Sequence, residues 1–383
     1  MTKIKLGEVV NFYDGYPFSK LEQQDKGDFN YIKITNFSSG EIILDQNKIN
    51  KPVKYREENI LNGNEIIVAM SGSTGKAAFN TYKNVLVNQR IAILRAKEDI
   101  VNPKYLRHLL VNSNFESYCN KLGTGLQKNI SKETIANYEF NLPSLKVQNE
   151  IVEVLDKFTE LEAELEAELE ARTKQYEYYR NKLLDFSTGS VGVPKIDKML
   201  AELCSEGVQI FTLREKAVVK TGSKPKEINL LEGLYDYINA GTTRSGYTNI
   251  FNCSGDTVTT PSRGQGGIGF IGYQKNPFWL GPLCYMIKPI NNTLSAKYLY
   301  YYLKSNAKSV FDLKKEGGTP AINKYDLETV TIAVPPIEVQ NEIVKILDNF
   351  SEYVSSISQG LPAEIAARRK QYEYYRNKLL TFE

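Results

Sequence analysis

Residues that could support catalysis are few in this chain. Its 383 residues include a single histidine, His108, in an apolar segment where a packed or surface role is more usual than catalysis. Because no other histidine is present, serine–histidine and cysteine–histidine catalysis are disfavoured. The cysteines have no CxxC spacing, which predicts reduced, buried thiols and neither a zinc site nor a disulfide framework. They are Cys119, Cys204, Cys253 and Cys284.

Three short motifs resemble catalytic or cofactor-binding sequences, and each departs from its pattern. Gly264, Gly266 and Gly269 match GxGxxG, but FIGYQ follows where a dinucleotide site needs a helix. The SGSTGKA segment at 71–77 resembles a phosphate loop, but Ala77 replaces the residue that binds magnesium. The NPFW segment at 276–279 is similar to the NPPF/NPPW motif of DNA amino-methyltransferases without its second proline. The sequence therefore predicts no catalysis, no metal site and no cofactor in this chain.

Polar and basic residues in glycine-rich and loop segments favour a binding role. Glycine allows a backbone to approach a ligand closely, and arginine and glutamine suit guanine and adenine edges. For each residue, an ordinary solvated loop is the alternative. The candidate DNA-binding residues are Ser71, Ser73, Thr74, Lys76, Asn88, Gln89, Arg90, Gln127, Lys128, Thr242, Thr243, Arg244, Ser262, Arg263 and Gln265.

Two repeated blocks organise the chain around these loops. QNEIVEVLDKF at 148–158 recurs as QNEIVKILDNF at 340–350, an offset of 192 (340 − 148). KQYEYYRNKLL at 174–184 recurs unchanged at 370–380, an offset of 196 (370 − 174). The second copy therefore contains four additional residues, and an internal duplication determines the architecture.

Each repeated block predicts a long helix. Apolar and aromatic residues follow one another alternately at four and three positions, the spacing of a coiled-coil seam. The segment ELEAELEAELEA at 160–171 is strongly helix-forming, so we expect an unbroken helix over 147–186, roughly 60 Å long. The second helix, over 339–383, has an additional four-residue step beside Gly360 and Pro362. Proline there predicts a kink or break.

The tyrosines of the second block divide into two groups. Tyr176, Tyr179, Tyr372 and Tyr375 lie on the seam and are expected in the core. Exposed tyrosine and arginine are typical of interfaces, and identity off the seam indicates one surface presented twice. Recent duplication without function is the alternative. The candidate partner-binding residues off the seam are Tyr178, Arg180, Tyr374 and Arg376.

A region of about 145 residues precedes each helix, a size typical of one domain. The two regions are diverged copies: Lys104-Tyr105-Leu106 matches 297–299, and Ile130-Ser131-Lys132 matches 322–324. Short strand-like segments and one short helix in each predict a small α+β domain. We expect strands near 31–34, 65–70, 84–94, 257–261 and 282–288, helices near 103–113 and 295–306, and a linker at 186–195. The predicted boundaries are 1–146, 147–186, 187–338 and 339–383.

Charge and hydropathy limit the possible cellular locations and binding partners of the chain. The net charge of +3 is too small to indicate nucleic-acid binding by itself. The first repeat helix is strongly acidic, so the rest of the chain carries a larger positive excess, which permits DNA binding. The N-terminal sequence has no apolar signal segment, and no run is long enough to cross a membrane. We expect a cytoplasmic protein without a membrane partner.

The order, the spacing and the amino-acid sequence of the repeats resemble those of the specificity (S) subunit of type I restriction–modification systems. The passages LPSLKVQNEIV and VPPIEVQNEIV, which lead from each globular region into its helix, are especially typical. The resemblance covers the whole chain. It implies an α+β fold with two target-recognition domains, each reading one half of a split, asymmetric DNA sequence. They are separated by two helices that form an antiparallel coiled coil, with a pseudo-twofold internal repeat.

The same resemblance implies partners. Double-stranded DNA and two methyltransferase (M) subunits are expected, with S-adenosylmethionine bound by the M subunits and not by this chain. Restriction (R) subunits would complete the nuclease. The expected function is sequence-specific recognition of a two-part DNA target by a non-catalytic subunit. The alternatives are a coiled-coil scaffold that binds no DNA and a DNA methyltransferase fragment.

Overall fold

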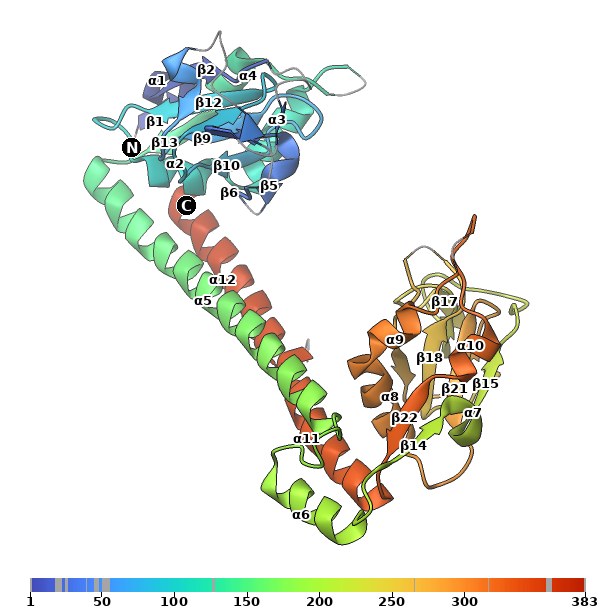
Figure 1. The fold of residues 1–383 in the computed structure, drawn as a ribbon. Coiled ribbons are helices and arrows are strands. Elements are labelled where there is room, and N and C mark those ends of the chain that lie inside the picture. Colours follow the sequence, from blue (N-terminus) through green and yellow to red (C-terminus); the bar gives the residue numbers. More distant parts are fainter. Residues whose placement is uncertain are drawn as a thin grey trace. The chain divides into compact units, whose positions relative to one another are not determined.

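Figure 1 shows the computed structural model of the chain. It describes residues 2–17, 23–24, 27–38, 40–44, 48–49, 56–125, 128–264, 266–315, 317–355 and 360–381. The chain divides into two compact units, which we describe separately. Unit 1 comprises Met1–Leu165 and Ile365–Glu383, and unit 2 comprises Glu166–Glu364.

The globular part of unit 1, here the first globule, is a layered α+β domain. Its strands are β1 (Thr2–Lys5), β2 (Val10–Asp14), β3 (Gln23–Gln24), β4 (Phe29–Ile32), β5 (Phe37–Ser38), β6 (Glu41–Ile42), β7 (Lys48–Ile49), β8 (Ile60–Leu61), β9 (Ile66–Ala69), β10 (Ala77–Phe79), β11 (Val85–Val87), β12 (Ile91–Ala96) and β13 (Glu139–Leu142). Its helices are α1 (Leu6–Val9), α2 (Pro103–Leu110), α3 (Ser113–Leu122) and α4 (Lys132–Ala136), with 3-10 turns at Ile34–Asn36 and Glu57–Asn59.

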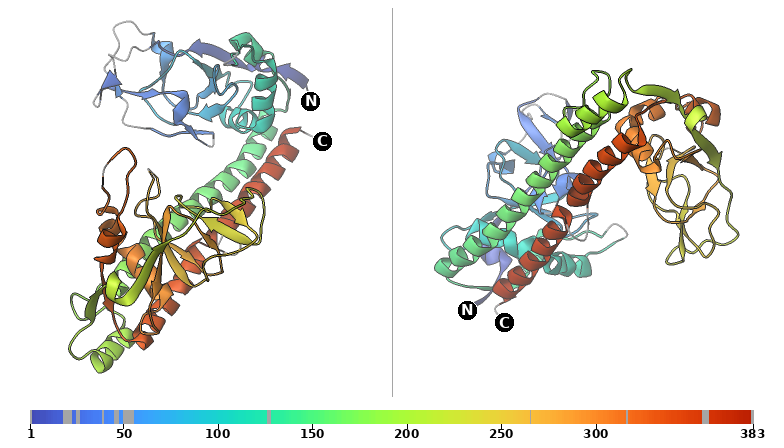
Figure 2. Two further views of the ribbon diagram at one scale, coloured as in Figure 1. Left: turned by 90° about the vertical axis from the view of Figure 1, so that its right-hand side faces the viewer. Right: turned by 90° about the horizontal axis from the view of Figure 1, so that it is seen from below.

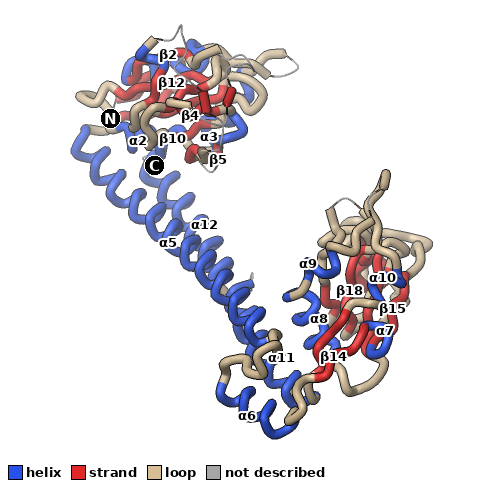
Figure 3. The backbone as a smooth tube through the Cα atoms, viewed as in Figure 1, coloured by secondary structure: helices blue, strands red, loops and turns tan. Residues whose placement is uncertain are grey.

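The globular part of unit 2, here the second globule, has the same kind of fold. Its strands are β14 (Gln209–Thr212), β15 (Ala217–Thr221), β16 (Tyr235–Ile238), β17 (Gly246–Thr248), β18 (Thr257–Pro261), β19 (Gly272–Gln274), β20 (Trp279–Leu280), β21 (Cys284–Pro289) and β22 (Thr331–Val334). Its helices are α7 (Leu213–Lys216), α8 (Ala296–Ser305), α9 (Ala307–Phe311) and α10 (Lys324–Glu328), and α6 (Pro194–Leu203) precedes it. Figure 3 distinguishes these helices and strands by colour.

The two globules share one strand order, which confirms the internal duplication. The main sheet contains β2-β12-β9-β10 in the first globule and β15-β21-β18-β19 in the second, with every neighbouring pair antiparallel. A separate antiparallel pair joins the first and last strands of each globule, β1 with β13 and β14 with β22. Each globule therefore begins and ends at one place, next to the helix that follows it.

Burial explains why these segments form the central strands. All four residues of β9, an apolar run, are buried in the middle of its sheet. All five residues of β18 are buried as well, although three of them are threonines. Asn102 caps α2 by accepting from two backbone N–H groups, and Ser295 caps α8 in the same way from one. The expected strands and helices near these residues are confirmed, with ends that differ by a few residues.

The long helices follow the sequence prediction closely. The helix α5 runs unbroken over Leu145–Leu183, about 58 Å at 1.5 Å per residue. The second copy is interrupted: α11 (Ile337–Ser355) ends and α12 (Leu361–Thr381) begins with Pro362 in its first turn. The break predicted beside Gly360 is therefore confirmed, because proline is tolerated in a first turn and not in a helix interior.

Contacts within each unit give the direction of helix packing. In unit 1, Phe158 of α5 stacks on Tyr375 of α12 at 5.4 Å, and Glu162 pairs with Arg369 at 2.5 Å. Residue numbers rise along α5 as they fall along its partner, so the two helices are antiparallel, as Figures 1 and 2 show for α5 and α12. In unit 2, Tyr179 of α5 lies 6.1 Å from Phe350 of α11.

The segment expected as a linker is more structured than its composition indicates. Val191 is 1% exposed and joins the apolar core of unit 2. Its backbone N–H donates to the Asp197 carboxylate at 2.7 Å, and α6 starts directly afterwards at Pro194. The sequence analysis missed α6, whose Ile196 and Leu200 are buried in the same core.

Candidate nucleic-acid interface

Backbone hydrogen bonds gather three candidate loops of the first globule. The Met70 N–H donates to the Arg90 carbonyl at 2.9 Å, and the Ile130 N–H donates to the Met70 carbonyl at 2.9 Å. Ser71 also forms an isolated β-bridge with Asn129. We call residues 71–76, 88–90 and 128–130 loop cluster 1.

An equivalent arrangement gathers the candidate loops of the second globule. The Ile322 N–H donates to the Ser262 carbonyl at 2.9 Å, and the backbones of Arg263 and Ala321 form an isolated β-bridge. A Cβ placed on Gly267 would lie 2.2 Å from the Ala240 carbonyl oxygen, so the two loops that carry these residues pack directly together. We call residues 239–244, 262–264, 266–269 and 320–322 loop cluster 2.

The glycines in these clusters have a structural reason that the sequence analysis did not identify. Gly75 has a φ of +81°, and a Cβ there would lie 2.4 Å from the Cβ of Cys119 in α3. Gly267 is confined in the same way by Ala240. Both glycines therefore allow close packing of protein segments, whereas we had expected them to allow close approach of a ligand.

Several candidate side chains are buried or form hydrogen bonds within the protein. Thr74 is fully buried and donates to Asn120 at 2.8 Å. Lys76 donates to the Phe37 carbonyl at 2.7 Å. Asn88 donates to the Tyr31 hydroxyl at 2.8 Å and accepts from the Arg90 N–H at 3.0 Å. Ser71 and Ser262 are each 8% exposed. These side chains shape the loops.

The remaining candidates that the structure describes are exposed. They are Ser73, Gln89, Arg90 and Lys128 in loop cluster 1, and Thr242, Thr243, Arg244 and Arg263 in loop cluster 2. Gln127 and Gln265 lie outside the described residues. The exposed set in each cluster therefore combines basic groups, which suit phosphates, with hydroxyl or amide groups, which suit base edges.

Loop cluster 2 borders a cleft of about 620 Å³ between the sheets of the second globule. Arg244 at its edge pairs with Asp236 at 3.6 Å and lies 4.6 Å from the ring centre of Tyr247. Gln274 also lines the cleft and donates to Thr259 at 3.3 Å. The sequence analysis did not select Gln274, because its position depends on the pairing of β18 with β19, which no local motif reveals.

Two of the four partner-binding candidates have the exposure that we expected. Tyr178 is 61% exposed and Tyr374 is 60% exposed. Each ring packs edge-on against the next tyrosine, Tyr179 at 5.4 Å and Tyr375 at 5.3 Å. The two repeats therefore present the same aromatic pair with nearly the same geometry.

The two arginine candidates are less exposed than the tyrosines: Arg180 is buried and Arg376 is partly buried. Arg180 is 8% exposed and donates to Asn181 at 3.0 Å. Arg376 donates to the Val111 carbonyl at the end of α2, at 3.1 Å. The seam predicts which residues face the partner helix, but the first globule also contacts α12 on another side, at Arg376.

The prediction that the seam tyrosines are core residues is only partly right. Tyr176 is 7% exposed, whereas Tyr179 is 41% exposed and Tyr375 is 37% exposed. Both of these exposed rings still contact the facing helix: Tyr375 stacks on Phe158, and Tyr179 packs at a tilt against Phe350. Two helices alone cannot enclose a tyrosine ring, so its outer edge remains in solvent.

Two of the motifs that resemble catalytic or cofactor-binding sequences are part of the packed fold of the second globule. Phe278 of the NPFW segment is 1% exposed, and the Trp279 indole N–H donates to the Ser223 carbonyl at 2.7 Å. The strand β19 follows the GxGxxG glycines in place of a helix. Burial raises the pKa of the Cys119 and Cys284 thiols to about 12, which disfavours the reactive thiolate. Within the described ranges no group of three or more His, Cys, Asp or Glu residues could hold a metal ion.

No described helix is long and apolar enough to cross a membrane. All four cysteines are free thiols.

Comparison with known proteins adds independent information. The family model of the type I restriction modification DNA specificity domain matches residues 1–171 and 205–367, one region in each copy. A type I restriction enzyme specificity subunit of Escherichia coli is 35% identical over 244 residues, which cover 62% of this chain and 60% of that subunit. A protein of Haemophilus influenzae, named as a type I restriction enzyme specificity subunit, is 30% identical over 347 residues, covering 86% of this chain and 85% of that protein.

Solved structures show the same fold. The crystal structure of a type I restriction–modification S subunit from M. genitalium aligns with a TM-score of 0.62 at 20% identity, covering 99% of this chain and 96% of that chain. A chain from a study of complex assembly and conformational transition of the type I system aligns with a TM-score of 0.61 at 18% identity, covering 99% and 97%. With the two regions matched by the family model, the chain belongs to the family of type I restriction–modification specificity subunits, the non-catalytic subunits that determine DNA specificity.

Proposed function

We propose that this chain recognises a two-part double-stranded DNA target, with one half read by each globule, and directs methyltransferase subunits to it. The duplicated loop clusters carry the proposal. Both are built on the same strand order, yet their exposed residues differ: Gln89 and Arg90 in one, Thr243 and Arg244 in the other. A conserved frame with different exposed side chains is suited to reading two different half-sites.

The long helices supply the spacing in this proposal. Half-sites about one helical turn apart, roughly 34 Å, present the same face of DNA to a rigid reader. The acidic ELEA units of α5 carry like charge to DNA phosphates and are therefore poor DNA ligands. We assign to them the role of spacer, and to the basic loops the role of reader.

The repeated aromatic pairs are the proposed docking points for two M subunits. Tyr178 with Tyr179, and Tyr374 with Tyr375, present large exposed rings on fixed helices. Tyrosine is frequent among residues that dominate binding energy at interfaces. Two equal surfaces suit two copies of one partner. S-adenosylmethionine would bind to those M subunits, R subunits would join them, and the complex would act on chromosomal DNA in the bacterial cytoplasm.

Co-expression with the M subunit of the same restriction–modification system tests the proposal. We expect a stable complex that methylates a two-part motif in host DNA, and loss of that methylation when this chain is deleted. A contiguous motif would contradict the assignment of one half-site to each globule. A stable complex that leaves the methylation pattern unchanged would favour a scaffold without DNA recognition.

Tyrosine variants test the docking points separately. Tyr178→Ala and Tyr374→Ala should each weaken one M site, by roughly 1–2 kcal/mol, and the double variant should weaken both. Tyr325→Ala is the control, since Tyr325 is 65% exposed and lies on α10 outside the repeated blocks. Mass photometry of the complexes should show M subunits lost in the double variant and retained in the control. Equal loss in the control would contradict the assignment.

A further inference from the structure

Each globule is joined to its following helix by a buried glutamine. Gln148 of α5 is fully buried. Its carbonyl accepts from the Asn102 N–H at 2.8 Å, and its amide donates to the carbonyls of Pro143 at 2.9 Å and Ile100 at 3.1 Å. These partners lie before α2 and before α5, so the glutamine joins two segments of the first globule to the helix.

The second unit repeats this connection. Gln340 of α11 is also fully buried. It accepts from the Ser295 N–H at 2.8 Å and donates to the carbonyls of Pro335 at 2.7 Å and Thr293 at 2.8 Å. The three backbone partners occupy corresponding positions in the two copies, so the attachment of globule to helix has been kept since duplication.

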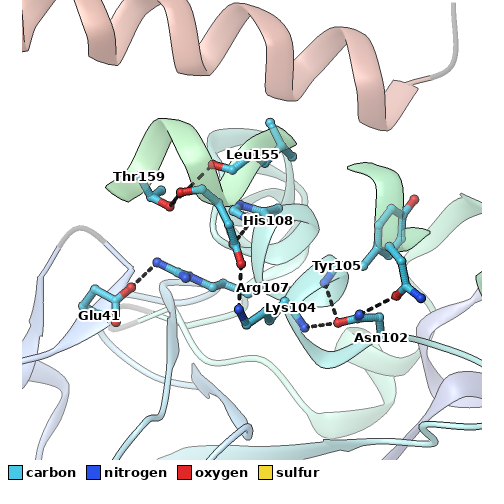
Figure 4. Close-up of polar contacts among 10 residues, drawn as sticks. Glu41, Asn102, Lys104, Tyr105, Arg107, His108, Leu155 and Thr159 are labelled. Atoms are coloured by element: carbon cyan, nitrogen blue, oxygen red, sulfur yellow. Dashed lines mark hydrogen bonds and ion pairs between the residues drawn. The ribbon is translucent and has the colours of Figure 1, made fainter. Parts of the chain in front are cut away.

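A charged pair forms the second part of each connection. Lys104 of α2 pairs with Asp156 of α5 at 2.7 Å, and Lys297 of α8 pairs with Asp348 of α11 at 2.7 Å. Figure 4 shows Lys104 on the side of α2 that faces α5, beside Asn102. Each pair lies two helical turns beyond the glutamine, so the two contacts together resist rotation of the globule about the helix.

The two connections differ at a third residue. In unit 1, His108 is 1% exposed, with Nε2 at 2.9 Å from the second Asp156 oxygen and Nδ1 at 2.9 Å from the Tyr372 hydroxyl. In unit 2, the corresponding Tyr301 hydroxyl donates to Asp348 at 2.6 Å. His108 therefore contacts residues of both long helices of unit 1, Asp156 of α5 and Tyr372 of α12, from its own position on α2; Figure 4 shows His108 facing α5.

The protons of this network follow from its partners. The hydrogen bond from His108 holds the pKa of Asp156 at about 2, so its carboxylate can only accept. Nε2 of His108 must then carry the proton. Burial lowers the pKa of His108 and keeps the ring neutral near pH 7, so Nδ1 accepts and the Tyr372 hydroxyl donates. In both hydrogen bonds, from His108 to Asp156 and from Tyr372 to His108, one atom donates and the other accepts.

Further contacts hold the end of α12 against the first globule. Arg376 donates to the Val111 carbonyl, and Leu380 is 7% exposed in the core of that globule. Arg107, next to His108, forms a close ion pair with Glu41 on the other side of α2. The first globule is therefore attached to two helices, and His108 is the buried polar contact common to both.

We propose that His108 is a positioning residue that fixes the orientation of the first globule on the helix pair and so narrows the range of half-site spacings that the protein accepts. This inference rests on the proposed two-part DNA recognition. As a scale, a tilt of about 10° displaces any point about 20 Å from its pivot by about 3.5 Å, close to one base-pair step. Loosening the junction should therefore broaden the accepted spacing and leave the recognised bases unchanged.

The experiment measures methylation of a plasmid library by the complex with its M subunits. The library carries both half-sites separated by the natural spacer and by spacers one or two base pairs shorter or longer. His108→Ala and Tyr372→Phe should raise methylation at the altered spacers, relative to the natural one, by about threefold or more, the scale of one lost hydrogen bond. His108→Gln, whose amide can donate and accept as the imidazole does, should restore the narrow profile.

Tyr325→Phe on α10 is the matched control and should reproduce the wild-type profile. An equal fall at all spacers in the His108→Ala complex would show a purely structural role and overturn the inference, as would an unchanged profile in a complex that melts at the wild-type temperature. If the wild-type complex methylates no two-part site, the proposed function fails and the inference with it. These outcomes distinguish failure of the positioning role from failure of DNA recognition.

Discussion

The junctions and the loop clusters of the two units have diverged to different extents. Gln148 and Gln340 have three backbone partners each at matching positions. In both units an aspartate two turns further along the same helix pairs with a lysine of the globule. The exposed loops on the same globules carry different side chains. A change at a junction would move a whole reader, whereas a change at an exposed loop alters only what is read. Under the proposed function, the comparison teaches that position and specificity would be encoded in separate parts of each unit.

The largest effect should come from changing the spacer itself. Deleting one ELEA unit, residues 164–167, shortens α5 by about 6 Å, close to two base-pair steps. We expect at least roughly tenfold less methylation at the natural spacing and new methylation at a shorter spacing, with both half-sites unchanged. Sequencing of the methylated library members gives the extent of methylation at each spacing and the bases of both half-sites. Altered half-site bases would contradict the separation of spacing from specificity.

Removing either junction glutamine should destabilise its own unit by a similar amount. Gln148→Ala and Gln340→Ala each leave buried backbone groups without partners, which we expect to cost roughly 2–4 kcal/mol. Urea unfolding followed by hydrogen exchange in each unit measures this. Glu150→Ala, at an exposed position on α5, is the control. A strongly unequal pair of values would show that the two junctions are not equivalent.

Loop substitutions should act on one half-site at a time. Arg90→Ala should relax recognition in the first half-site only, and Arg244→Ala in the second only, each by about 1–3 kcal/mol if the arginine contacts a base. Methylation mapping of each variant complex tests this. Lys157→Ala, an exposed lysine on α5, is the control and should leave both half-sites unchanged. Relaxation of both half-sites by one variant would contradict separate reading.

The smallest effect should be a pH dependence that only unit 1 shows. Burial lowers the folded-state pKa of His108 below its ordinary 6.5, opposed by Asp156 and assisted by the charges of Arg107 and Arg376. The unfolded chain therefore binds a proton below pH 6.5 that the folded unit does not, so stability falls as pH decreases. The slope cannot exceed about 1.4 kcal/mol per pH unit.

Thermal melts between pH 5 and pH 7 check this expectation. The depressed pKa of Asp156 adds a loss only below its ordinary 3.8, as pH falls toward about 2, outside this window. His108→Gln should flatten the dependence, because His108 is the single histidine of the chain. A variant with the wild-type slope would assign the effect to other groups.

Much of the architecture follows from the sequence because it depends on local pattern. The repeated blocks predict α5, and Pro362 predicts the interruption before α12. Both junction glutamines and aspartates also lie within the QNEIV and LD letters of the first block. Helix periodicity and proline chemistry act over a few residues, so one sequence suffices for these features.

The exposure of site residues depends on contacts far along the chain and could not be predicted in the same way. Thr74 is buried because α3 supplies Asn120, 46 residues later. Arg376 contacts Val111 of the first globule on a side of the helix that the heptad does not describe. Sequence spacing identified the loops and the helices, whereas tertiary packing decided which of their side chains reach solvent.

Replacing the second globule with a copy of the first tests the central claim most directly. The chimaera would carry Thr2–Leu142 in place of Gln209–Val334, which exchanges one closed set of strands for its duplicate. After co-purification with the M subunits confirms assembly, methylation mapping should find the first half-site twice, in inverted orientation, on either side of the spacer. A motif that still contains the second half-site would contradict the claim that each globule reads one half of the target.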